Sequence, residues 1–267
     1  MDKRVGERAG TLRLARGAIR YRVDGAGLPL VLLATLSGGW ARQVPALRKH
    51  FTVLTYDMRG FGGSASGPGF PTNAEHADDL ADLMDALGLD TAVVVGLSHG
   101  GLVAQHFAAK HPQRLDGLGL VATFAAPHGP TLMLLRLLQG YLARDDVAGF
   151  WEVLRSMLFS AANADTLLRH ETELRRAMFD QYDAAALDSI YTQAIEHDSR
   201  HWLGGVSCPT LVVGGAEDIL FPPVLTQQLA DLIPGSRLHL LPAAHVPPVE
   251  VPRTFNDLVV ATFGAPA

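Results

Sequence analysis

Apolar and polar positions alternate at the start of the chain and then give way to longer apolar runs. Residues 11–16 and 18–23 alternate on either side of Gly17, as in an antiparallel hairpin with one solvated face. Residues 29–34 and 51–56 are almost continuously apolar, as in strands covered on both faces. The pattern therefore predicts a sheet that begins antiparallel and becomes parallel.

Helical periodicity separates these strands from further apolar strands. The expected strands are 91–95, 115–122, 209–213 and 237–241, and the expected core helices are 40–50, 73–87 capped by Asn73, one directly after residue 100, 222–233 and 249–263. Strands that alternate with helices of this length predict a doubly wound α/β sheet.

This alternation stops between residues 126 and 205. The segment has no strand pattern, only helical periodicity over 132–143, 147–159, 165–179 and 184–197. A helical insertion of this size predicts a cap, or lid, over the carboxyl edge of the sheet. We therefore expect a core formed by residues 1–125 and 206–267 and a cap domain formed by 126–205.

Composition and charge narrow the class of partner. The chain has 267 residues, of which 48% are hydrophobic, which is enough for a large core, and a net charge of −5. No block of Lys and Arg could bind nucleic acid or an anionic membrane, and no apolar run predicts a signal peptide or a membrane span. We expect a cytoplasmic protein with a small-molecule partner; the oligomeric state stays open.

The segment Gly96-Leu97-Ser98-His99-Gly100 lies between an apolar strand and a helix. Glycines two residues on either side of a serine allow a strained strand-to-helix turn that exposes the hydroxyl above the sheet. This pattern is typical of a nucleophile elbow with Ser98 as the nucleophile. The alternative is a glycine-rich turn with an incidental serine.

A serine nucleophile needs a histidine base and a carboxylate that orients the histidine. Both should follow strands at the same sheet edge as Ser98. Glu217 and Asp218 follow the strand that ends at Val213, and His245 follows the strand that ends at Leu241. The order serine, acid, histidine is that of α/β-hydrolases.

Four further motifs are similar to those of the α/β-hydrolase superfamily. They are Trp40-x-x-Gln43-Val-Pro45-x-Leu47, Asp57-x-Arg59-Gly60-x-Gly62-x-Ser64, Gly215-x-x-Asp218 and His245-x-x-x-x-Glu250-x-Pro252-x-x-Phe255. Together with the elbow they cover nearly the whole chain, which resembles the capped esterase and enol-lactonase branch. The resemblance implies an α/β-hydrolase fold and a triad of Ser98, Asp218 and His245, with Glu217 as a surface charge.

The resemblance also implies an oxyanion hole formed by two backbone N–H groups. One belongs to His99, after the nucleophile, and the other to Leu36, in the loop after the strand over 29–34. The sequence departs from the family twice here: Ala34-Thr35 replaces the usual His-Gly pair, and His99 replaces an apolar residue. We expect the His99 side chain to serve packing rather than catalysis.

These features predict a serine hydrolase that cleaves an ester or lactone bond of an apolar small molecule through an acyl-enzyme. The same triad could hydrolyse a carbon–carbon bond or a thioester, and the fold could also serve a receptor without turnover. No cofactor is implied. No metal site is expected either, because His197 and His201 have the spacing of helical zinc ligands but no third ligand accompanies them.

The cap should determine substrate preference. Its arginines are dispersed, so a largely apolar pocket for a neutral, medium-sized acyl or lactone group is expected. Trp151, Met157 and Phe159 are the candidate substrate-binding residues.

Overall fold

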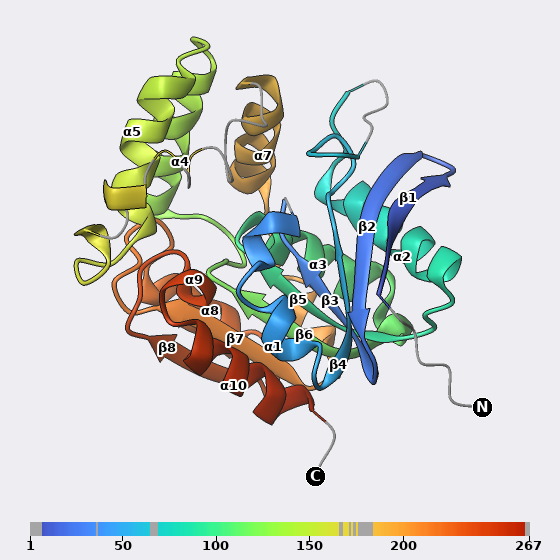
Figure 1. Cartoon of the computed structure of the whole chain (residues 1–267). Coiled ribbons are helices and arrows are strands. Elements are labelled where there is room, and N and C mark those ends of the chain that lie inside the picture. The colour runs from blue at the N-terminus through green and yellow to red at the C-terminus, as the bar shows by residue number, and fades with distance from the viewer. Residues whose placement is uncertain are drawn as a thin grey trace.

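The computed structural model describes residues 7–35, 37–64, 69–165, 168–170, 172, 175 and 184–264. Eight strands form one sheet in the order β1-β2-β4-β3-β5-β6-β7-β8 (Figure 1). Their bounds are β1 Arg8–Leu14, β2 Gly17–Gly25, β3 Leu28–Leu33, β4 Phe51–Tyr56, β5 Ala92–Leu97, β6 Leu115–Val121, β7 Thr210–Gly215 and β8 Arg237–Leu241. β2 is antiparallel to β1 and β4, and the other pairs are parallel. The predicted change from antiparallel to parallel pairing is confirmed.

The helices follow the predicted alternation. Those of the core are α1 Val44–Leu47, α2 Asn73–Leu87, α3 His99–Lys110, α8 Pro223–Asp231, α9 Pro247–Glu250 and α10 Pro252–Phe263, with short 3₁₀ turns at Ser37–Trp40, Pro112–Arg114 and Leu203–Gly205. Within the described ranges, no helix combines the length and apolar character needed to cross a bilayer.

Three helix boundaries differ from the prediction for local reasons. The helix expected over 40–50 is reduced to a 3₁₀ turn and the short α1, because Pro45 lacks the N–H that a continuous helix needs there. Pro252 similarly separates α9 from α10. Thr72, not Asn73, caps α2 through a capping box with Glu75. Asn73 is the first helical residue, and its side chain is free to bond elsewhere.

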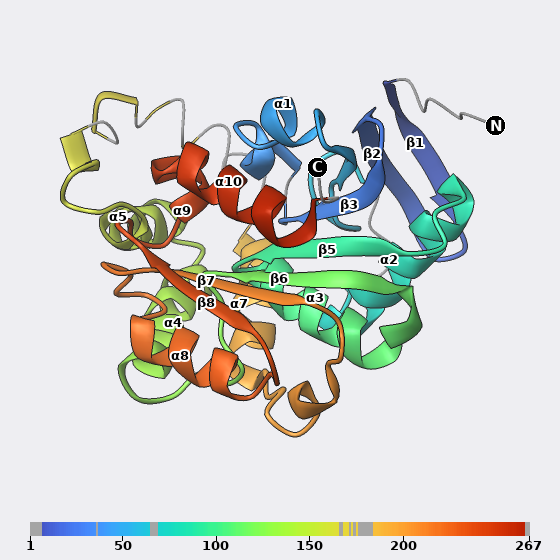
Figure 2. The same cartoon turned by 90° about the horizontal axis from the view of Figure 1, so that it is seen from below.

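Helices cover both faces of the sheet (Figure 2). Alternate residues of β3 show how the two faces separate. Val31 and Leu33 belong to the apolar cluster that includes residues of α2, α3 and α8, whereas Leu30 and Leu32 belong to the cluster that includes residues of α1 and α10. A strand that is buried on both faces must be apolar at successive positions, which explains the continuous runs in the sequence. The predicted α/β-hydrolase fold is confirmed.

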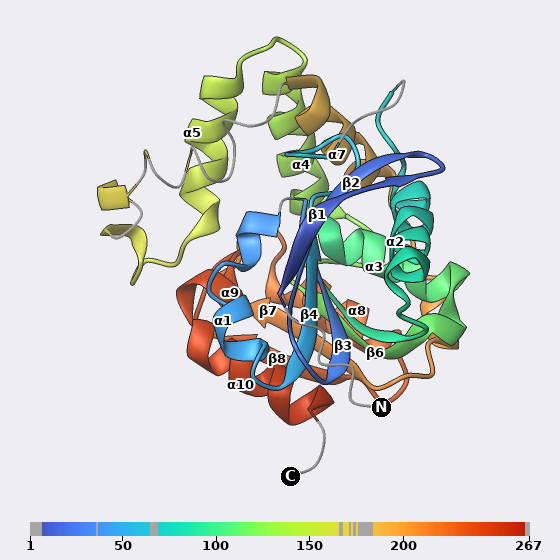
Figure 3. The ribbon, with the colours of Figure 1, turned by 45° about the vertical axis from the view of Figure 1, so that its right-hand side comes forward.

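Among the described residues, three helices lie beyond the carboxyl ends of the strands: α4 Gly129–Leu142, α5 Val147–Leu158 and α7 Ala184–Glu196 (Figures 1 and 3). They form a separate apolar cluster that includes Leu138, Phe150 and Trp151 and extends to Leu102 and Phe221 of the core. The helix expected over 165–179 lies largely outside the described residues. The boundaries of the cap as a domain stay a prediction.

The buried Gln105 of α3 joins the two connections between this helical segment and the core. Its amide nitrogen donates to Phe124 O at 3.0 Å, and its amide oxygen accepts from Ser199 Oγ at 2.5 Å. The two connections also bond to each other, because Ser199 N donates to Ala125 O at 2.8 Å. The helix that follows Ser98 therefore also fixes where the three upper helices leave and rejoin the sheet.

Three buried histidines are held in their neutral form. Burial lowers the pKa of His76, His99 and His197 to about 3 in each case, with neighbouring Arg59, His76 and His106, respectively, as the next cause. Between about pH 6.5 and about pH 3, the three imidazoles are protonated in the unfolded chain but not in the folded chain. Their contribution to stability is therefore complete above about pH 6.5 and is lost as the pH falls toward about 3.

We predict that His197→Gln weakens the acid dependence of folding stability. In the wild type, the free energy of unfolding should fall between about pH 7 and about pH 5, and in this variant the fall should be smaller by about 1 to 2 kcal/mol. Urea denaturation at the two pH values measures it. His201→Gln, at an exposed position nearby, is the matched control and should keep the wild-type dependence. Equal pH dependence in both variants and the wild type would contradict the prediction.

Candidate active site

Ser98 occupies a strained turn between β5 and α3. Its backbone has φ 53° and ψ −116°, and its N–H donates to Val121 O at 2.8 Å. A Cβ atom on Gly96 would lie 2.3 Å from Gly100 O, and one on Gly100 would lie 2.3 Å from Leu33 O. Both glycines are therefore required by backbone contacts, as the sequence pattern predicts. The turn presents the Ser98 hydroxyl above the carboxyl edge of the sheet.

Asp218 lies in the loop between β7 and α8 and is almost completely buried. Its Oδ1 accepts hydrogen bonds from Leu220 N at 2.9 Å and Phe221 N at 2.8 Å. These two N–H groups fix the carboxylate and leave Oδ2 to bond elsewhere. The loop thus orients one oxygen of Asp218 toward the neighbouring loop.

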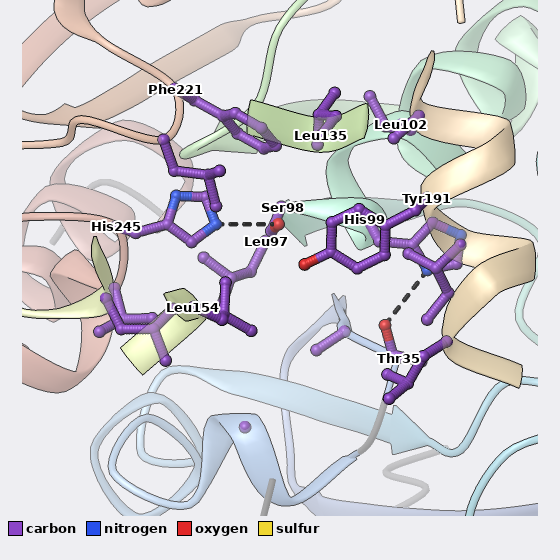
Figure 4. Close-up of a pocket in the computed structure, with 18 residues that line it drawn as sticks. Thr35, Leu97, Ser98, His99, Leu102, Leu135, Leu154, Tyr191, Phe221 and His245 are labelled. Atoms are coloured by element: carbon purple, nitrogen blue, oxygen red, sulfur yellow. Dashed lines mark hydrogen bonds between the residues drawn. The ribbon is translucent and has the colours of Figure 1, made fainter. Parts of the chain in front are cut away.

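His245 lies in that neighbouring loop, between β8 and α9, and connects Asp218 with Ser98. Its Nδ1 lies 2.9 Å from Asp218 Oδ2, and its Nε2 lies 3.1 Å from Ser98 Oγ (Figure 4). An ionised carboxylate only accepts hydrogen bonds, so Nδ1 donates to Asp218 and Nε2 accepts from the Ser98 hydroxyl. The structure brings the three residues predicted as a triad into one chain of hydrogen bonds.

The loops that carry Asp218 and His245 touch at Gly215. A Cβ atom there would lie 1.9 Å from Ala244 O, so only glycine fits. Glu217 N donates to Ala243 O at 2.9 Å, which joins the two loops a second time. The distance between Asp218 and His245 is therefore set by backbone contacts as well as by their side chains.

Two carboxylates join these loops to the segment that follows α5. Glu250 Oε1 accepts from Ala244 N at 2.6 Å, next to His245, while its Oε2 accepts from Ser160 N at 2.9 Å and Asn163 Nδ2 at 2.9 Å. Glu217 is exposed, as expected, and accepts from Ala161 N at 3.2 Å. Glu250 was part of a family motif in the sequence, but its bonds to residues far along the chain could not be read from the motif.

The structure describes His99 but not Leu36, the two residues expected to donate to the oxyanion. His99 is the first residue of α3, where backbone N–H groups have no partner within the helix and point away from its start. This position suits the role predicted for its N–H. Leu36 lies outside the described residues, so the second donor stays a prediction from the sequence.

The side chain of His99 is buried and bonded at both ring nitrogens. Nε2 lies 3.0 Å from Asn73 Oδ1, and Nδ1 lies 3.2 Å from Thr35 Oγ1. Because a carbonyl oxygen only accepts, Nε2 carries the proton, and Nδ1 accepts from the Thr35 hydroxyl. Thr35 and His99, the two departures from the family pattern, are thus direct partners. Asn73, which the sequence suggested only as a cap, fixes the tautomer.

A pocket of about 180 Å³ adjoins Ser98. Most of its wall is apolar and comes from the sheet edge, α3, the Asp218 loop and the upper helices, including Leu102, Leu135, Leu154, Leu158 and Leu187. Its polar side chains are Thr35, Ser98, His99, Tyr191 and His245 (Figure 4). The lining contains no Lys, Arg, Asp or Glu side chain among the residues described. A neutral, largely apolar ligand fits these walls.

The residues expected to contact substrate do not line this pocket. Trp151 and Met157 are buried among the upper helices, and Phe159 packs at the edge of the same cluster. Leu154 and Leu158 of α5, four residues apart and therefore on one face of that helix, line the pocket instead. The sequence showed that these helices carry large apolar residues, but the face turned to Ser98 depends on how they pack.

The described residues contain no group of three or more His, Cys, Asp or Glu side chains suited to a metal ion. His197 is buried and bonded to Gln105, with 3.2 Å between its Nε2 and the amide oxygen. His201 is exposed beside the ring of Trp202. The two histidines therefore lie in different environments.

Comparison with known proteins identifies the family. Residues 27–250 match the family model described as alpha/beta hydrolase fold. A curated relative from Caulobacter sp. (strain K31), named "Putative carbamate hydrolase RutD", is 32% identical over 240 residues, covering 86% of this chain and 88% of its own.

Two solved structures are also similar over almost their full lengths. A hydrolase from Pseudomonas aeruginosa PA01 is 33% identical with a TM-score of 0.84, covering 96% of this chain and 98% of its own. The enol-lactonase from Burkholderia xenovorans LB400 is 29% identical with a TM-score of 0.85, covering 95% of this chain and 99% of its own. By sequence and by fold, the chain belongs to the α/β-hydrolase family.

Proposed function

We propose that this α/β-hydrolase is a serine hydrolase that cleaves an ester or lactone bond of a neutral, apolar small molecule. Ser98 Oγ attacks the carbonyl carbon while His245 Nε2 takes its proton, and Asp218 stabilises the imidazolium that forms. The His99 N–H binds the oxyanion, and the protonated His245 then gives its proton to the departing alcohol oxygen. Water activated by the same histidine releases the acid and restores Ser98.

One observation carries this proposal. The distances of 3.1 Å from Ser98 Oγ to His245 Nε2 and 2.9 Å from His245 Nδ1 to Asp218 Oδ2 support the roles of nucleophile, base and orienting acid. The pocket reaches Ser98 itself, so a bound carbonyl group can lie beside the hydroxyl. The cap proposed over residues 126–205 supplies part of the apolar wall, through residues such as Leu135, Leu154 and Leu158.

An ester or lactone fits the apolar wall, and a similar structure supports this choice among the candidate bonds. An enol-lactone is a cyclic ester, and the similar structure that bears this name supports the choice. A carbamate is the second candidate, because the Caulobacter relative carries the name of a carbamate hydrolase. Thioesters and the carbon–carbon bonds of β-diketones need the same attack on a carbonyl. A receptor that binds without turnover would use the pocket alone.

A substrate panel tests the proposal. Purified wild-type protein should be assayed with matched esters, lactones, thioesters, carbamates and β-diketones of equal chain length, together with labelling of Ser98 by a fluorophosphonate. We expect the highest kcat/KM for esters or lactones and labelling at Ser98. Labelling with a preference for carbamates would assign the second candidate. The absence of both turnover and labelling would overturn the serine-hydrolase assignment.

We predict that Ser98→Ala folds normally and loses turnover, because the substitution removes only the attacking oxygen and leaves both glycines of the turn. The value of kcat should fall by about a thousandfold or more. Steady-state kinetics measures it, with circular dichroism and thermal unfolding as the check on folding. Activity near that of the wild type would exclude Ser98 as the nucleophile.

We predict opposite outcomes for the two adjacent acids. Asp218→Asn should lower kcat by about 10²- to 10⁴-fold, because an amide no longer selects the imidazole tautomer that accepts the serine proton. Glu217→Gln is the matched control, and at this exposed side chain it should change kcat by less than about threefold. Measurement of kcat and KM for both variants on one ester tests which of the two acids is needed. A larger loss in Glu217→Gln would reverse the assignment of the acid.

We predict that Leu158→Ala alters the preference for acyl length, whereas Trp151→Ala does not. Leu158 lines the pocket, and Trp151 packs among the upper helices. In Leu158→Ala, the ratio of kcat/KM for short acyl esters to that for long ones should change by a factor that corresponds to about 1 to 3 kcal/mol. A chain-length series of p-nitrophenyl esters measures the shift. Trp151→Ala should instead lower the melting temperature with an unchanged length profile, and a changed profile in that variant alone would contradict the prediction.

A further inference from the structure

Most of the polar side chains that line the pocket are hydrogen-bonded to one another. Ser98 and His245 form the hydrogen-bonded pair at its base, and Thr35 bonds to His99. The second ring nitrogen of His99 bonds to Asn73, outside the pocket. Among the polar side chains that line the pocket, this leaves Tyr191 of α7.

The Tyr191 hydroxyl has no hydrogen-bond partner among the residues that the structure describes, and the residue is only 9% exposed. Its ring is held edge-on against the buried Phe150, with 5.3 Å between ring centroids and 87° between planes. Figure 4 shows the hydroxyl on the side of the ring that faces Ser98. The ring is therefore fixed while its polar end points into the pocket.

A phenol in this position is a neutral donor. Burial raises the pKa of Tyr191 well above its ordinary range, so the hydroxyl keeps its proton. The hydroxyl faces the open space of the pocket and is not fully enclosed. A ligand that fills this space removes its hydration, which is costly unless a hydrogen bond replaces it. A substrate that offers an oxygen acceptor at this point satisfies the hydroxyl, whereas an alkyl chain leaves it unpaired.

We propose that Tyr191 is a specificity-determining residue that donates a hydrogen bond to a second oxygen of the substrate, apart from the bond that is cleaved. The substrate class is then a neutral ester or lactone whose apolar body carries one ketone, ether or hydroxyl oxygen. A carboxylate fits less well, because no cationic side chain lines the pocket in the part of the chain that the structure describes. The part of this inference that concerns turnover rests on the proposed function, whereas the part that concerns binding does not.

The test compares substrates that differ by one oxygen. The first series is p-nitrophenyl heptanoate and the esters in which one methylene of that chain at a time is replaced by an ether oxygen or a ketone. The second series places the same replacements in the alcohol, with a fixed acyl group. For each ester, kcat/KM is measured relative to its all-carbon parent in the wild type and in Tyr191→Phe.

We expect the wild type to prefer one position of the oxygen. In Tyr191→Phe this relative preference should fall about tenfold, because one hydrogen bond supplies a ratio of that size. The all-carbon ester is the internal reference in each protein, so a general change of activity in Tyr191→Phe cancels from the ratio. Tyr141→Phe is the matched control, since Tyr141 lies on α4 and packs against Arg144 outside the pocket lining. It should keep the wild-type preference.

Equilibrium binding gives a second readout that needs no turnover. Calorimetric titration of Ser98→Ala and of Ser98→Ala with Tyr191→Phe, using the preferred oxygenated ester and its all-carbon parent, should show the same tenfold difference, or about 1.4 kcal/mol. The role of Tyr191 is overturned if proteins with Tyr191 and with Phe at this position show the same preference for the oxygenated ester, in binding and in both ester series. If the wild type instead hydrolyses none of the esters but the binding difference persists, the proposed reaction fails while the recognition by Tyr191 stands.

Discussion

The site depends on one backbone constraint, the strained positive-φ conformation of Ser98 between β5 and α3. A non-glycine residue in a sparsely populated backbone region costs about 1 to 3 kcal/mol and persists only where the surroundings enforce it. Here the enforcement comes from Val121 O, which accepts the Ser98 N–H, and from the contacts of Gly96 with Gly100 and of Gly100 with Leu33. The strain is thus held by three adjacent parallel strands, and it places the hydroxyl and the start of α3 at the same point of the sheet edge.

The partners of Ser98 are placed by a second set of backbone contacts. Gly215 allows the Asp218 and His245 loops to touch, and Glu250 bonds both to the residue before His245 and to the segment after α5. Gln105, one helix away from Ser98, anchors the two connections of the upper helices. Movement of those helices relative to the sheet would have to break buried or charge-assisted hydrogen bonds, which are the stronger kind. The position of His245 and the shape of the pocket are therefore coupled.

Local sequence signals were sufficient for the sheet and for the glycine-flanked turn at Ser98, because strand burial and glycine requirements are set within a few residues. The strands that Asp218 and His245 follow indicated that both lie at the same sheet edge as Ser98. Local signals were insufficient where a side chain is directed by packing between distant segments. Met157 and Leu158 are adjacent and both apolar, yet only Leu158 lines the pocket. Likewise, Pro45 and Pro252 interrupt helices that apolar periodicity alone extends, and nothing local to Asn73 indicates that its partner is His99.

The two departures from the family pattern are best understood as one change. The Thr35 hydroxyl donates to Nδ1 of His99, and Nε2–H of His99 donates to Asn73, so each group satisfies a partner that would otherwise be buried and unpaired. Losing either Thr35 or His99 alone leaves such a group, which makes the pair more costly to change singly than together. The same bonds occupy the hydrogen-bonding groups of this wall, while burial keeps His99 neutral. A neutral wall of this kind discriminates among ligands by shape and by individual hydrogen bonds rather than by charge.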